Sequence, residues 1–350
     1  MGKQDIDYLI VGGGIAGALL AYALVESGKS VKLVHASING EASPISAGLI
    51  NPITGQRFVK TWQWELLHQV FVDFYTKLEL DFQCKLLRSI SIFQYLNSIE
   101  EENQCASRML DIEYQNYLEF DKSKVNENDI FPLLKINRAY LLDINLLLKK
   151  IFIYLEQKGV LFIEKFDYSD FDAAHLVWKK FEIKGGVVFS EGSFVMDNPY
   201  FQNLPFMAVK GHRSIVESKD YLFDNNVFKL NYSIIPIDKH RYWIGSNYEF
   251  NNRSVELNKE ECEAQRNFIE NNVILPRSTI VNQTIGIRPA MRDRRPVVGS
   301  HPDYKRIYII NGLGTKGSSL APYCVTQLVK YMLNGENVDK EIHIKRFIWK

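Results

Sequence analysis

Cysteine is scarce in this sequence. Only four occur in 350 residues, and no two of them form a CxxC pair. Cys84, Cys105, Cys262 and Cys324 are widely spaced, a pattern that indicates neither a zinc site nor a redox dithiol. The seven histidines form no recognisable metal-ligand or Ser/His/Asp pattern. We therefore expect no bound metal, and we expect the thiols to be reduced, as is usual in the cytoplasm.

Long apolar runs and an excess of one charge are also missing. No segment reaches the roughly 18 uninterrupted apolar residues of a membrane-spanning helix. The apolar stretch Leu9–Leu24 is interrupted by glycines and preceded by Asp5 and Asp7 instead of a basic cluster, so we do not expect a signal peptide. The 42 Lys and Arg residues nearly balance the 41 Asp and Glu residues, which leaves a net charge of +1. That charge gives no strong signal for binding nucleic acid or an anionic membrane.

What the sequence does contain is a glycine-rich turn between a short apolar strand and an apolar helix. The segment is residues 7–17, DYLIVGGGIAG. Gly12 permits a tight turn, Gly14 lets the backbone approach a pyrophosphate, and Gly17 lets the helix pack closely on the strand. The N–H groups at the helix start, together with the helix dipole, attract phosphates. The pattern predicts a dinucleotide-binding site.

The sequence around this turn fits a βαβ unit. Apolar residues recur at helical spacing through Ile15–Ser27, Gly28 is a suitable helix end, and Ser30–His35 has the pattern of a second strand. The unit is complete within about thirty residues, its usual size. A plain α/β turn that binds no ligand is the alternative interpretation.

Further along, α/β segments enclose two insertions. We predict helices over 63–80, 143–157, 256–274 and 318–333, and strands over 160–166, 187–189, 241–244 and 306–310. Because the chain exceeds the size of one typical core, we expect two lobes. We predict an α/β fold in which a Rossmann-like nucleotide-binding lobe (1–80, 136–204 and 286–350) is interleaved with a mostly antiparallel α+β substrate lobe (81–135 and 205–285). The acidic stretch 100–128 would form the outer part of the second lobe.

Two motifs near the C-terminus resemble those of a known flavoprotein family. The first is Gly286-Ile287-Arg288-Pro289, and the second is residues 312–322, GLGTKGSSLAP. Together with the N-terminal glycines they resemble the D-amino-acid oxidase family, which includes glycine oxidase and sarcosine oxidase. The second motif is most similar to the C-terminal oxidase domain of the bifunctional enzyme that matures the wobble uridine of tRNA. Segments 47–52 and 204–211 also match, so the resemblance covers nearly the whole chain in the right order.

The resemblance implies an FAD cofactor bound without a covalent link, and it makes the first lobe the FAD-binding domain. Residues 47–49 would lie along the flavin ring, and the N–H groups of 314–318 would face its pyrimidine end, where Lys316 adds a full charge. A glycine-rich turn that only caps a helix is the alternative for 314–318. The residues expected to bind FAD are Val11, Gly12, Gly14, Ile15, Ala16, Gly17, His35, Ala36, Ala47, Gly48, Leu49, Phe166, Glu191, Gly192, Arg288, Gly312, Gly314, Thr315, Lys316, Gly317 and Ser318.

The same resemblance assigns Arg288 and Tyr248 to the substrate. In the family, the Arg of this motif binds the substrate carboxylate through a paired hydrogen bond, to which the guanidinium geometry is suited. Tyr248 matches a residue that lines the pocket of glycine oxidase. Two structural alternatives stay open: Arg288 as a bridge between a strand and a loop, and Tyr248 as an ordinary half-buried strand residue.

Two positions depart from the family pattern. His35 ends the second strand, where a carboxylate usually accepts hydrogen bonds from ribose hydroxyls. A neutral imidazole accepts only one, which would weaken FAD binding or hint at NADP, although the C-terminal motifs argue against NADP. Ser233 stands where glycine oxidase has a tyrosine that helps bind the carboxylate. Its neighbour Tyr232 should point to the opposite face of the strand, so the substrate would differ from a simple amino acid.

The function implied is oxidation of a C–N bond in an amino acid or N-substituted glycine-type amine, by hydride transfer to flavin. The expected partner is therefore a small-molecule amine or amino acid; the oligomeric state stays open. Three alternatives remain: a flavin dehydrogenase with an acceptor other than oxygen, a tRNA wobble-uridine oxidase, and a flavin-free binding protein.

Overall fold

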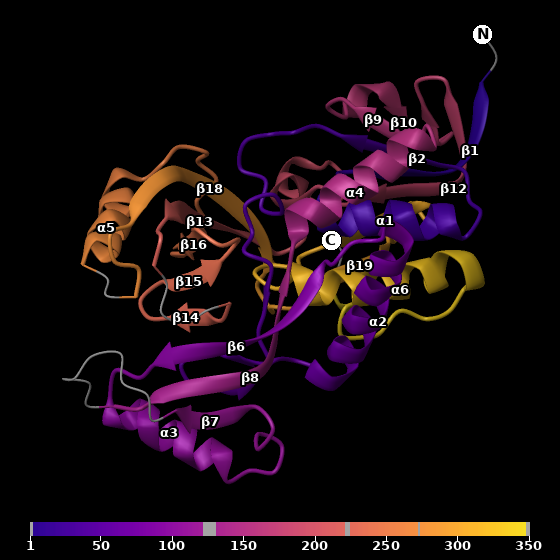
Figure 1. The fold of residues 1–350 in the computed structure, drawn as a ribbon. Coiled ribbons are helices and arrows are strands. Elements are labelled where there is room, and N and C mark those ends of the chain that lie inside the picture. The colour runs from indigo at the N-terminus through magenta and orange to yellow at the C-terminus, as the bar shows by residue number, and fades with distance from the viewer. Residues whose placement is uncertain (1–2, 122–130, 221–224, 272–273, 348–350) are drawn as a thin grey trace.

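The computed structural model describes residues 3–121, 131–220, 225–271 and 274–347. Two large β-sheets dominate it, and the chain passes between them several times (Figure 1). One sheet is mainly parallel and covered by helices, whereas the other is mainly antiparallel. The predicted α/β fold class is confirmed. None of the described helices has the length and apolar character that crossing a bilayer requires.

The first sheet carries the glycine-rich turn. Its strands are β1 (Gln4–Val11), β2 (Val31–His35), β9 (Leu161–Ile163), β10 (Phe171–Asp172), β11 (Val177–Trp178), β12 (Phe181–Phe189), β19 (Val297–Ser300) and β20 (Ile307–Asn311). The parallel core has the order β9-β2-β1-β12-β20, with β19 antiparallel to β20. Because these parallel strands end at one edge, that edge is where an open α/β sheet offers a ligand site.

Four helices pack around this sheet and against one another: α1 (Ile15–Glu26), α2 (Trp64–Phe82), α4 (Ile144–Gln157) and α6 (Gly317–Asn334). Helix α1 is apolar almost all round because it lies beside the sheet and contacts both α4 and α6. Leu19, Leu20 and Leu24 are completely buried. The predicted βαβ unit is confirmed, since β1 pairs in parallel with β2 across α1 and Gly28 adopts a positive φ of 74° after the helix end.

The second sheet is built from β3 (Leu49–Ile50), β6 (Leu87–Tyr95), β7 (Leu118–Asp121), β8 (Leu133–Leu142), β13 (Phe206–Glu217), β14 (Val227–Lys229), β15 (Ser233–Pro236), β16 (Arg241–Gly245), β17 (Glu249–Phe250) and β18 (Thr279–Met291). Its order is β17-β13-β16-β15-β14-β6-β8-β3, with β18 on β13 and β7 on β8. Strands β13 and β18 pair along nearly their whole lengths. Only β14 and β6 are paired in parallel among the described strands of this sheet.

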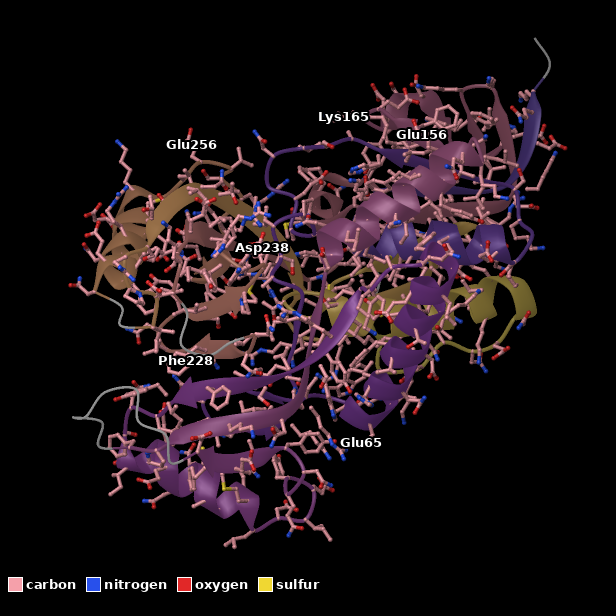
Figure 2. The ribbon with its side chains drawn as sticks, viewed as in Figure 1. Glu65, Glu156, Lys165, Phe228, Asp238 and Glu256 are labelled. Carbon is pink, nitrogen blue, oxygen red and sulfur yellow. The ribbon has the colours of Figure 1, made fainter. Side chains whose placement is uncertain are left out.

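Smaller elements complete the fold: α3 (Ile99–Met109), α5 (Lys259–Glu270), the hairpin β4 (Ile53–Thr54) with β5 (Val59–Lys60), and 3-10 helices at Tyr168–Asp170, Gly192–Asp197 and Ile344–Arg346. Side chains fill the space between the ribbons, as Figure 2 shows. The labelled Phe228 is completely buried, whereas Glu65 and Glu156 are exposed on helices.

Some predicted boundaries shift. The helix predicted over 256–274 starts only at Lys259, because the Asn258 side chain caps it by accepting hydrogen bonds from the N–H groups of Glu260 and Glu261. Residues 272–273 of that helix, and 122–128 of the acidic stretch, lie outside the described residues. The proposed division into lobes stays a prediction. Strands β8 and β18 each run across one of its boundaries, at 135/136 and 285/286.

Candidate functional site

A cavity of about 910 Å³ lies between the two sheets. One side is formed by the carboxyl edge of the first sheet and the starts of α1 and α6. The other is formed by one face of β13, β14, β15, β16 and β18. It extends from the Gly12–Gly14 turn to the loop that precedes α6. The cavity is therefore elongated and bordered by two helix N-termini.

The glycine-rich turn shapes one end of this cavity. Gly12 adopts a φ of 102°, and a Cβ there would lie 2.5 Å from the Ser190 carbonyl oxygen. Gly14 caps α1 in an extended conformation with no side-chain hydrogen bond, and the first turn of α1 holds no acidic residue. Ser43 accepts a hydrogen bond from the Ile15 N–H at 3.1 Å. A helix N-terminus of this kind is suited to an anion such as a pyrophosphate.

His35 and Glu41 lie together beside the turn. His35 packs so closely that a Cβ at Gly13 would lie 2.6 Å from its ring, and burial lowers the pKa of the imidazole. Glu41 lies 4.0 Å from His35 Nδ1 and lines the cavity, and burial raises the pKa of its carboxyl. Sequence reasoning found no carboxylate at the end of β2. In the structure the loop that follows β2 brings Glu41 to this position. Glu41 belongs to no motif with a fixed spacing, so the sequence alone did not indicate it.

The loop before α6 shapes the other end. Gly314, Thr315, Lys316, Gly317 and Ser318 all line the cavity. The Lys316 amine lies 3.4 Å from Thr54 Oγ1 and 3.3 Å from Thr61 Oγ1. Burial, with smaller contributions from the nearby Arg295 and Arg294 charges, lowers the pKa of Lys316 to about 8. The α6 N-terminus and this amine make the end of the cavity electropositive.

A buried carboxyl lies beyond the end of β12. Glu191 accepts hydrogen bonds from the Tyr168 hydroxyl at 2.6 Å and from Asn198 Nδ2 at 2.7 Å. Burial raises the pKa of Glu191 to about 7, although both hydrogen bonds favour the carboxylate. Next to it, the Ser190 hydroxyl donates to the carbonyl oxygens of Val11 and Gly12, which joins β12 to the glycine turn.

Arg288 reaches the cavity from β18. Its guanidinium lies across Gly211 of β13, where a Cβ would lie 2.3 Å from Nη2. It donates hydrogen bonds to the Ser246 hydroxyl and, at 3.4 Å, to the Asn247 carbonyl. The Tyr248 ring centre lies 5.0 Å from the guanidinium carbon. Burial lowers the pKa of Arg288, and among the described residues no carboxylate oxygen lies within 4 Å of it. Arg288 thus bridges a strand and a loop and still faces the cavity as an unpaired cation.

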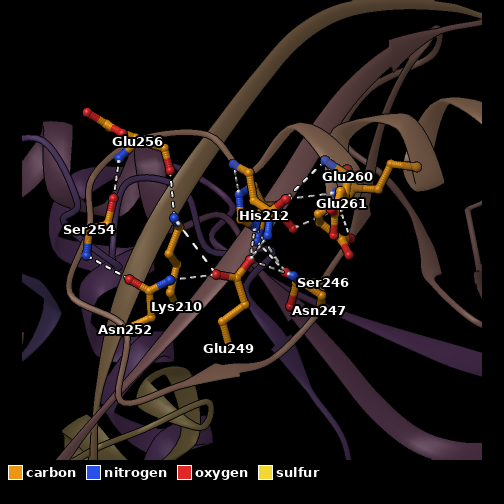
Figure 3. Close-up of polar contacts among 12 residues, drawn as sticks. Lys210, His212, Ser246, Asn247, Glu249, Asn252, Ser254, Glu256, Glu260 and Glu261 are labelled. Carbon is orange, nitrogen blue, oxygen red and sulfur yellow. Dashed lines mark hydrogen bonds and ion pairs between the residues drawn. The ribbon is translucent and has the colours of Figure 1, made fainter.

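A polar network holds the loop of Ser246 and Asn247, the two residues to which Arg288 donates, in place (Figure 3). Asn247 Oδ1 accepts from the His212 N–H at 2.8 Å, and Asn247 Nδ2 donates to Glu249 at 3.2 Å. His212 Nε2 accepts from the Asn258 N–H at 2.9 Å, so its proton must be on Nδ1, which faces Asn247 and Glu249. Burial lowers the pKa of His212. The neutral imidazole therefore fixes the position of the residues that contact Arg288.

Most of the predicted site residues line this one cavity, including Tyr248, a residue that is 57% exposed. Three predicted FAD contacts do not: Gly17, Gly48 and Gly312. Each lies behind the wall, where backbone (at Gly17 and Gly48) or the Met291 side chain (at Gly312) leaves no room for a Cβ. That atom would lie 1.9 Å from the Gly12 carbonyl oxygen, 1.9 Å from the Leu142 carbonyl oxygen and 2.6 Å from Met291 Cγ, respectively.

Sequence reasoning missed several residues that line the cavity. Ser43, Arg213, Lys229 and Ser246 belong to no motif, and only the pairing of distant strands and loops brings them to the site. Tyr232, by contrast, points away from the cavity as expected, because its hydroxyl donates to Glu261 while Ser233 faces the cavity.

Comparison with known proteins identifies the family. The model of the FAD dependent oxidoreductase (DAO) family matches residues 7–329. The chain belongs to this family. It is therefore an FAD-dependent oxidoreductase and an enzyme, and its cofactor is FAD. This finding overturns the flavin-free alternative.

Three relatives illustrate the similarity. The chain is 23% identical over 359 residues to YurR, an uncharacterised oxidoreductase of Bacillus subtilis, with 93% of this chain and 94% of YurR covered. The bifunctional tRNA 5-methylaminomethyl-2-thiouridine biosynthesis protein MnmC of Polaromonas naphthalenivorans is 26% identical over 152 residues, which covers 40% of this chain and 21% of MnmC. Glycine oxidase from Geobacillus kaustophilus has a TM-score of 0.82 at 16% identity, with 99% of this chain and 100% of that chain covered. The last match shows a shared fold.

The residues of this site fit FAD. The cavity is long enough to join two helix N-termini, and neither first turn contains an acidic residue. At Gly12 a side chain would collide with backbone, so glycine leaves the turn open for a pyrophosphate. In this family the bound FAD supplies the hydride acceptor; the protein supplies binding, orientation and charge.

Proposed function

We propose that this enzyme oxidises the C–N bond of an amino acid or an N-substituted glycine-type amine. The observation that carries the proposal is Arg288, a buried guanidinium that faces the cavity and has no carboxylate partner among the described residues. A planar carboxylate matches the paired donors of a guanidinium, and a fixed carboxylate fixes the carbon next to it. The electropositive loop at 314–318 lies on the same cavity.

Each end of the cavity then has a role. The Gly12–Gly14 turn and the start of α1 would bind the pyrophosphate, and Glu41 would accept hydrogen bonds from the ribose in place of the carboxylate that β2 lacks. The start of α6 and Lys316 would hold the flavin ring and favour negative charge there. Arg288 holds the substrate carboxylate, with Tyr248 covering the guanidinium. The oxidised substrate is an imine, which water hydrolyses.

Supporting evidence comes from the family match and from a fold shared with glycine oxidase, whose name states its substrate. The tRNA alternative has weaker support, because the match to MnmC covers 21% of that protein and this chain has a net charge of +1. A dehydrogenase that passes electrons to an acceptor other than oxygen remains the second candidate, and it shares the same site.

An anaerobic bleaching assay tests the proposal. The FAD-loaded enzyme is mixed under nitrogen with glycine, sarcosine, iminodiacetate and the D- and L-amino acids, and the flavin absorbance is followed. We expect at least one of these compounds to bleach the flavin, with an equivalent of hydrogen peroxide formed when air is readmitted. Bleaching without peroxide would identify the dehydrogenase. An enzyme that holds FAD but is bleached by none of the panel would contradict the proposed function.

A further inference from the structure

One loop connects the two sides of the cavity. It runs through residues 36–48, between the end of β2 and the start of β3. Glu41 of this loop lies 4.0 Å from His35 Nδ1, and Ser43 accepts the Ile15 N–H at the start of α1. Both contacts lie on the side of the first sheet, where the ADP half of FAD is proposed to bind. Loop 36–48 therefore carries polar groups toward the proposed ribose and pyrophosphate positions.

The backbone of the same loop is anchored on the second sheet. The Gly40 carbonyl accepts the Ile287 N–H of β18 at 2.9 Å. Further along, the Ile45 carbonyl accepts hydrogen bonds from Trp243 Nε1 of β16 at 2.9 Å and from Arg213 Nη1 of β13 at 3.4 Å. A carbonyl oxygen has two lone pairs, so it accepts from both donors. Three strands of the second sheet, β13, β16 and β18, thus hold a loop that reaches toward the first sheet (Figure 1).

The Trp243 indole reaches this carbonyl by crossing Gly245, which projects from the same face of β16. A Cβ at Gly245 would lie 2.9 Å from Trp243 Cη2 and 3.1 Å from Cζ3, so a side chain there would displace the ring. Trp243 lines the cavity but is only 9% exposed. A buried indole N–H needs an acceptor, and an N–H that loses its acceptor without reaching water destabilises the fold. The Ile45 carbonyl is the acceptor that the loop supplies.

Arg213 is the second donor to the loop, and its guanidinium is itself held by the sheet. Nε donates to Thr284 Oγ1 of β18 at 2.9 Å, while Nη1 donates to the Ile45 carbonyl. The contact with Thr284 directs the side chain toward β18, the strand that also donates to Gly40. The Arg213 contact with Ile45 is longer than that of Trp243, so Trp243 makes the stronger hydrogen bond. Arg213 therefore connects β13, β18 and loop 36–48.

The Ile45 side chain packs against Gly286 of β18. A Cβ at Gly286 would lie 2.3 Å from Ile45 Cδ1 and 3.2 Å from the Glu41 carbonyl oxygen. The absence of a side chain at Gly286 lets the loop lie against the strand, two residues before Arg288. The first residue of the 286–289 motif thus has a packing role, which is to leave space for loop 36–48.

We propose that Trp243 and Arg213 position loop 36–48 for the ADP half of FAD. They are positioning residues, because they act on the cofactor through the Ile45 carbonyl. The inference rests on the part of the proposed function that assigns the ribose to Glu41 and the pyrophosphate to the start of α1. Fixing a loop costs conformational entropy, and contacts that fix it before the ligand arrives reduce the cost of binding. Side chains of the second sheet thereby contribute to cofactor affinity.

Binding of ADP to enzyme from which FAD has been removed tests the inference, because ADP contains the ribose and the pyrophosphate but no flavin. Dissociation constants are measured by calorimetry for ADP and by quenching of flavin fluorescence for FAD. We expect Trp243→Phe, which removes the N–H, to weaken ADP and FAD by the same factor, about 3- to 10-fold, the usual effect of one hydrogen bond. Arg213→Met should weaken both ligands by an equal or smaller factor, and Arg213→Lys, which keeps a donor, should retain part of the affinity.

A double variant and a control locate the effect. In Glu41→Ala the loop no longer contacts the ribose, so adding Trp243→Phe should reduce ADP affinity less than it does in the unaltered enzyme. Tyr242→Phe is the matched control, because Tyr242 projects from the opposite face of the same strand and its hydroxyl donates to the Lys239 carbonyl at 3.3 Å. This variant should leave both dissociation constants unchanged.

Three results would overturn the inference. One is unchanged ADP affinity in Trp243→Phe or, should that variant not fold, in Arg213→Met. Another is weaker FAD binding with unchanged ADP binding, which would place the indole against the flavin ring. The third is an equal effect of Trp243→Phe with and without Glu41, which would show that the indole does not act through the loop.

The outcome for the proposed function is read separately, because ADP binding does not involve amine oxidation. Unchanged ADP affinity in Trp243→Phe, in an enzyme whose flavin an amine bleaches, would reject this inference alone. Weaker ADP binding in that variant, with no bleaching of the unaltered enzyme by any amine, would reject the proposed amine oxidation alone. Unchanged ADP affinity in Glu41→Ala would reject the proposed ribose position together with this inference.

Discussion

At the scale of single residues, the fold holds the Arg288 guanidinium in place before any substrate binds. Among the described residues, a hydroxyl, a carbonyl and an aromatic ring contact this cation, and none of them neutralises it. Gly211 provides the flat surface on which the side chain lies. The network through His212 and Asn247 keeps the neighbouring loop in position. A preorganised cation of this kind loses little entropy when a carboxylate arrives.

Replacing this residue should therefore damage substrate binding and spare the cofactor. Removing one partner of a buried ion pair costs about 2–5 kcal/mol, so Arg288→Ala should lower kcat/KM about 30-fold or more, chiefly through KM. Arg288→Lys keeps the charge but loses the paired donors, so its kcat/KM should lie between those of the unaltered enzyme and of Arg288→Ala. Steady-state kinetics with the amine that bleaches the flavin measures the loss of kcat/KM. The flavin absorbance of the purified variants shows whether FAD is retained. Unchanged kinetics in Arg288→Ala would remove Arg288 from the substrate site.

At the scale of elements, α1 is pressed against the turn that precedes it. A Cβ at Gly17 would lie 1.9 Å from the Gly12 carbonyl oxygen and 2.4 Å from Ser190 Oγ. The first of these atoms is backbone and cannot rotate away. The contact joins β1, α1 and β12 at the point where the pyrophosphate is proposed to bind. Close packing here is therefore a condition for the shape of the cavity, although Gly17 does not line it.

Gly17→Ala should push the helix away from the turn. We expect the free energy of unfolding to fall by about 1–3 kcal/mol, the usual cost of overpacking, and FAD to bind more weakly. Gly317→Ala is the control for stability: it also adds a methyl group to a helix glycine, but the nearest atom would lie 3.5 Å away. Urea unfolding of both variants, with FAD affinity measured by fluorescence, tests this. Equal urea midpoints for the two variants would contradict the argument.

Elements defined by local patterns could be predicted from the sequence, and elements defined by tertiary contacts could not. The strand, turn and helix of residues 7–27 follow from glycine spacing and apolar periodicity, both of which are local. The start of α5 depends on the Asn258 cap, a single side-chain contact that the apolar pattern of 256–274 does not reveal. For the site, the glycine turn and Arg288 belong to motifs. Glu41, Arg213 and Lys229 reach the cavity through loop paths and strand register, which a single sequence does not encode in any fixed spacing.

At the scale of the whole molecule, acid should destabilise the fold, because several buried or half-buried histidines must be neutral. His212 Nε2 accepts the Asn258 N–H, His301 Nδ1 accepts the Asp303 N–H at 3.1 Å, and His343 Nδ1 accepts the Lys345 N–H at 3.0 Å. A ring nitrogen that accepts a hydrogen bond carries no proton, so protonation there would set two donors against each other. Burial lowers the pKa of all three imidazoles.

The sign of the pH dependence follows from these directions. In the unfolded chain a histidine titrates near 6.5, so below about pH 6.5 the unfolded chain takes up protons that the folded protein does not. The stability from neutral histidines is complete above that pH and is lost as the pH falls toward their lower folded pKa values. Glu191 acts in the opposite direction, since its pKa is raised to about 7 and its contribution is lost as the pH rises through that value. Burial also lowers the pKa of His35 and His68 and raises the pKa of Glu41, so among these groups five histidines against two carboxyls leave a net loss of stability in acid.

We therefore expect the free energy of unfolding, measured by urea denaturation with saturating FAD, to be at least about 1 kcal/mol lower at pH 5.5 than at pH 7.5, since each net proton contributes about 1.4 kcal/mol per pH unit. His301→Gln and His343→Gln each remove one proton-uptake site from the unfolded chain and should reduce the difference between the two pH values. Glu191→Gln should increase it, because the opposing group is gone. Equal stability at both pH values, or a larger stability at pH 5.5, would contradict the neutral state inferred for these histidines.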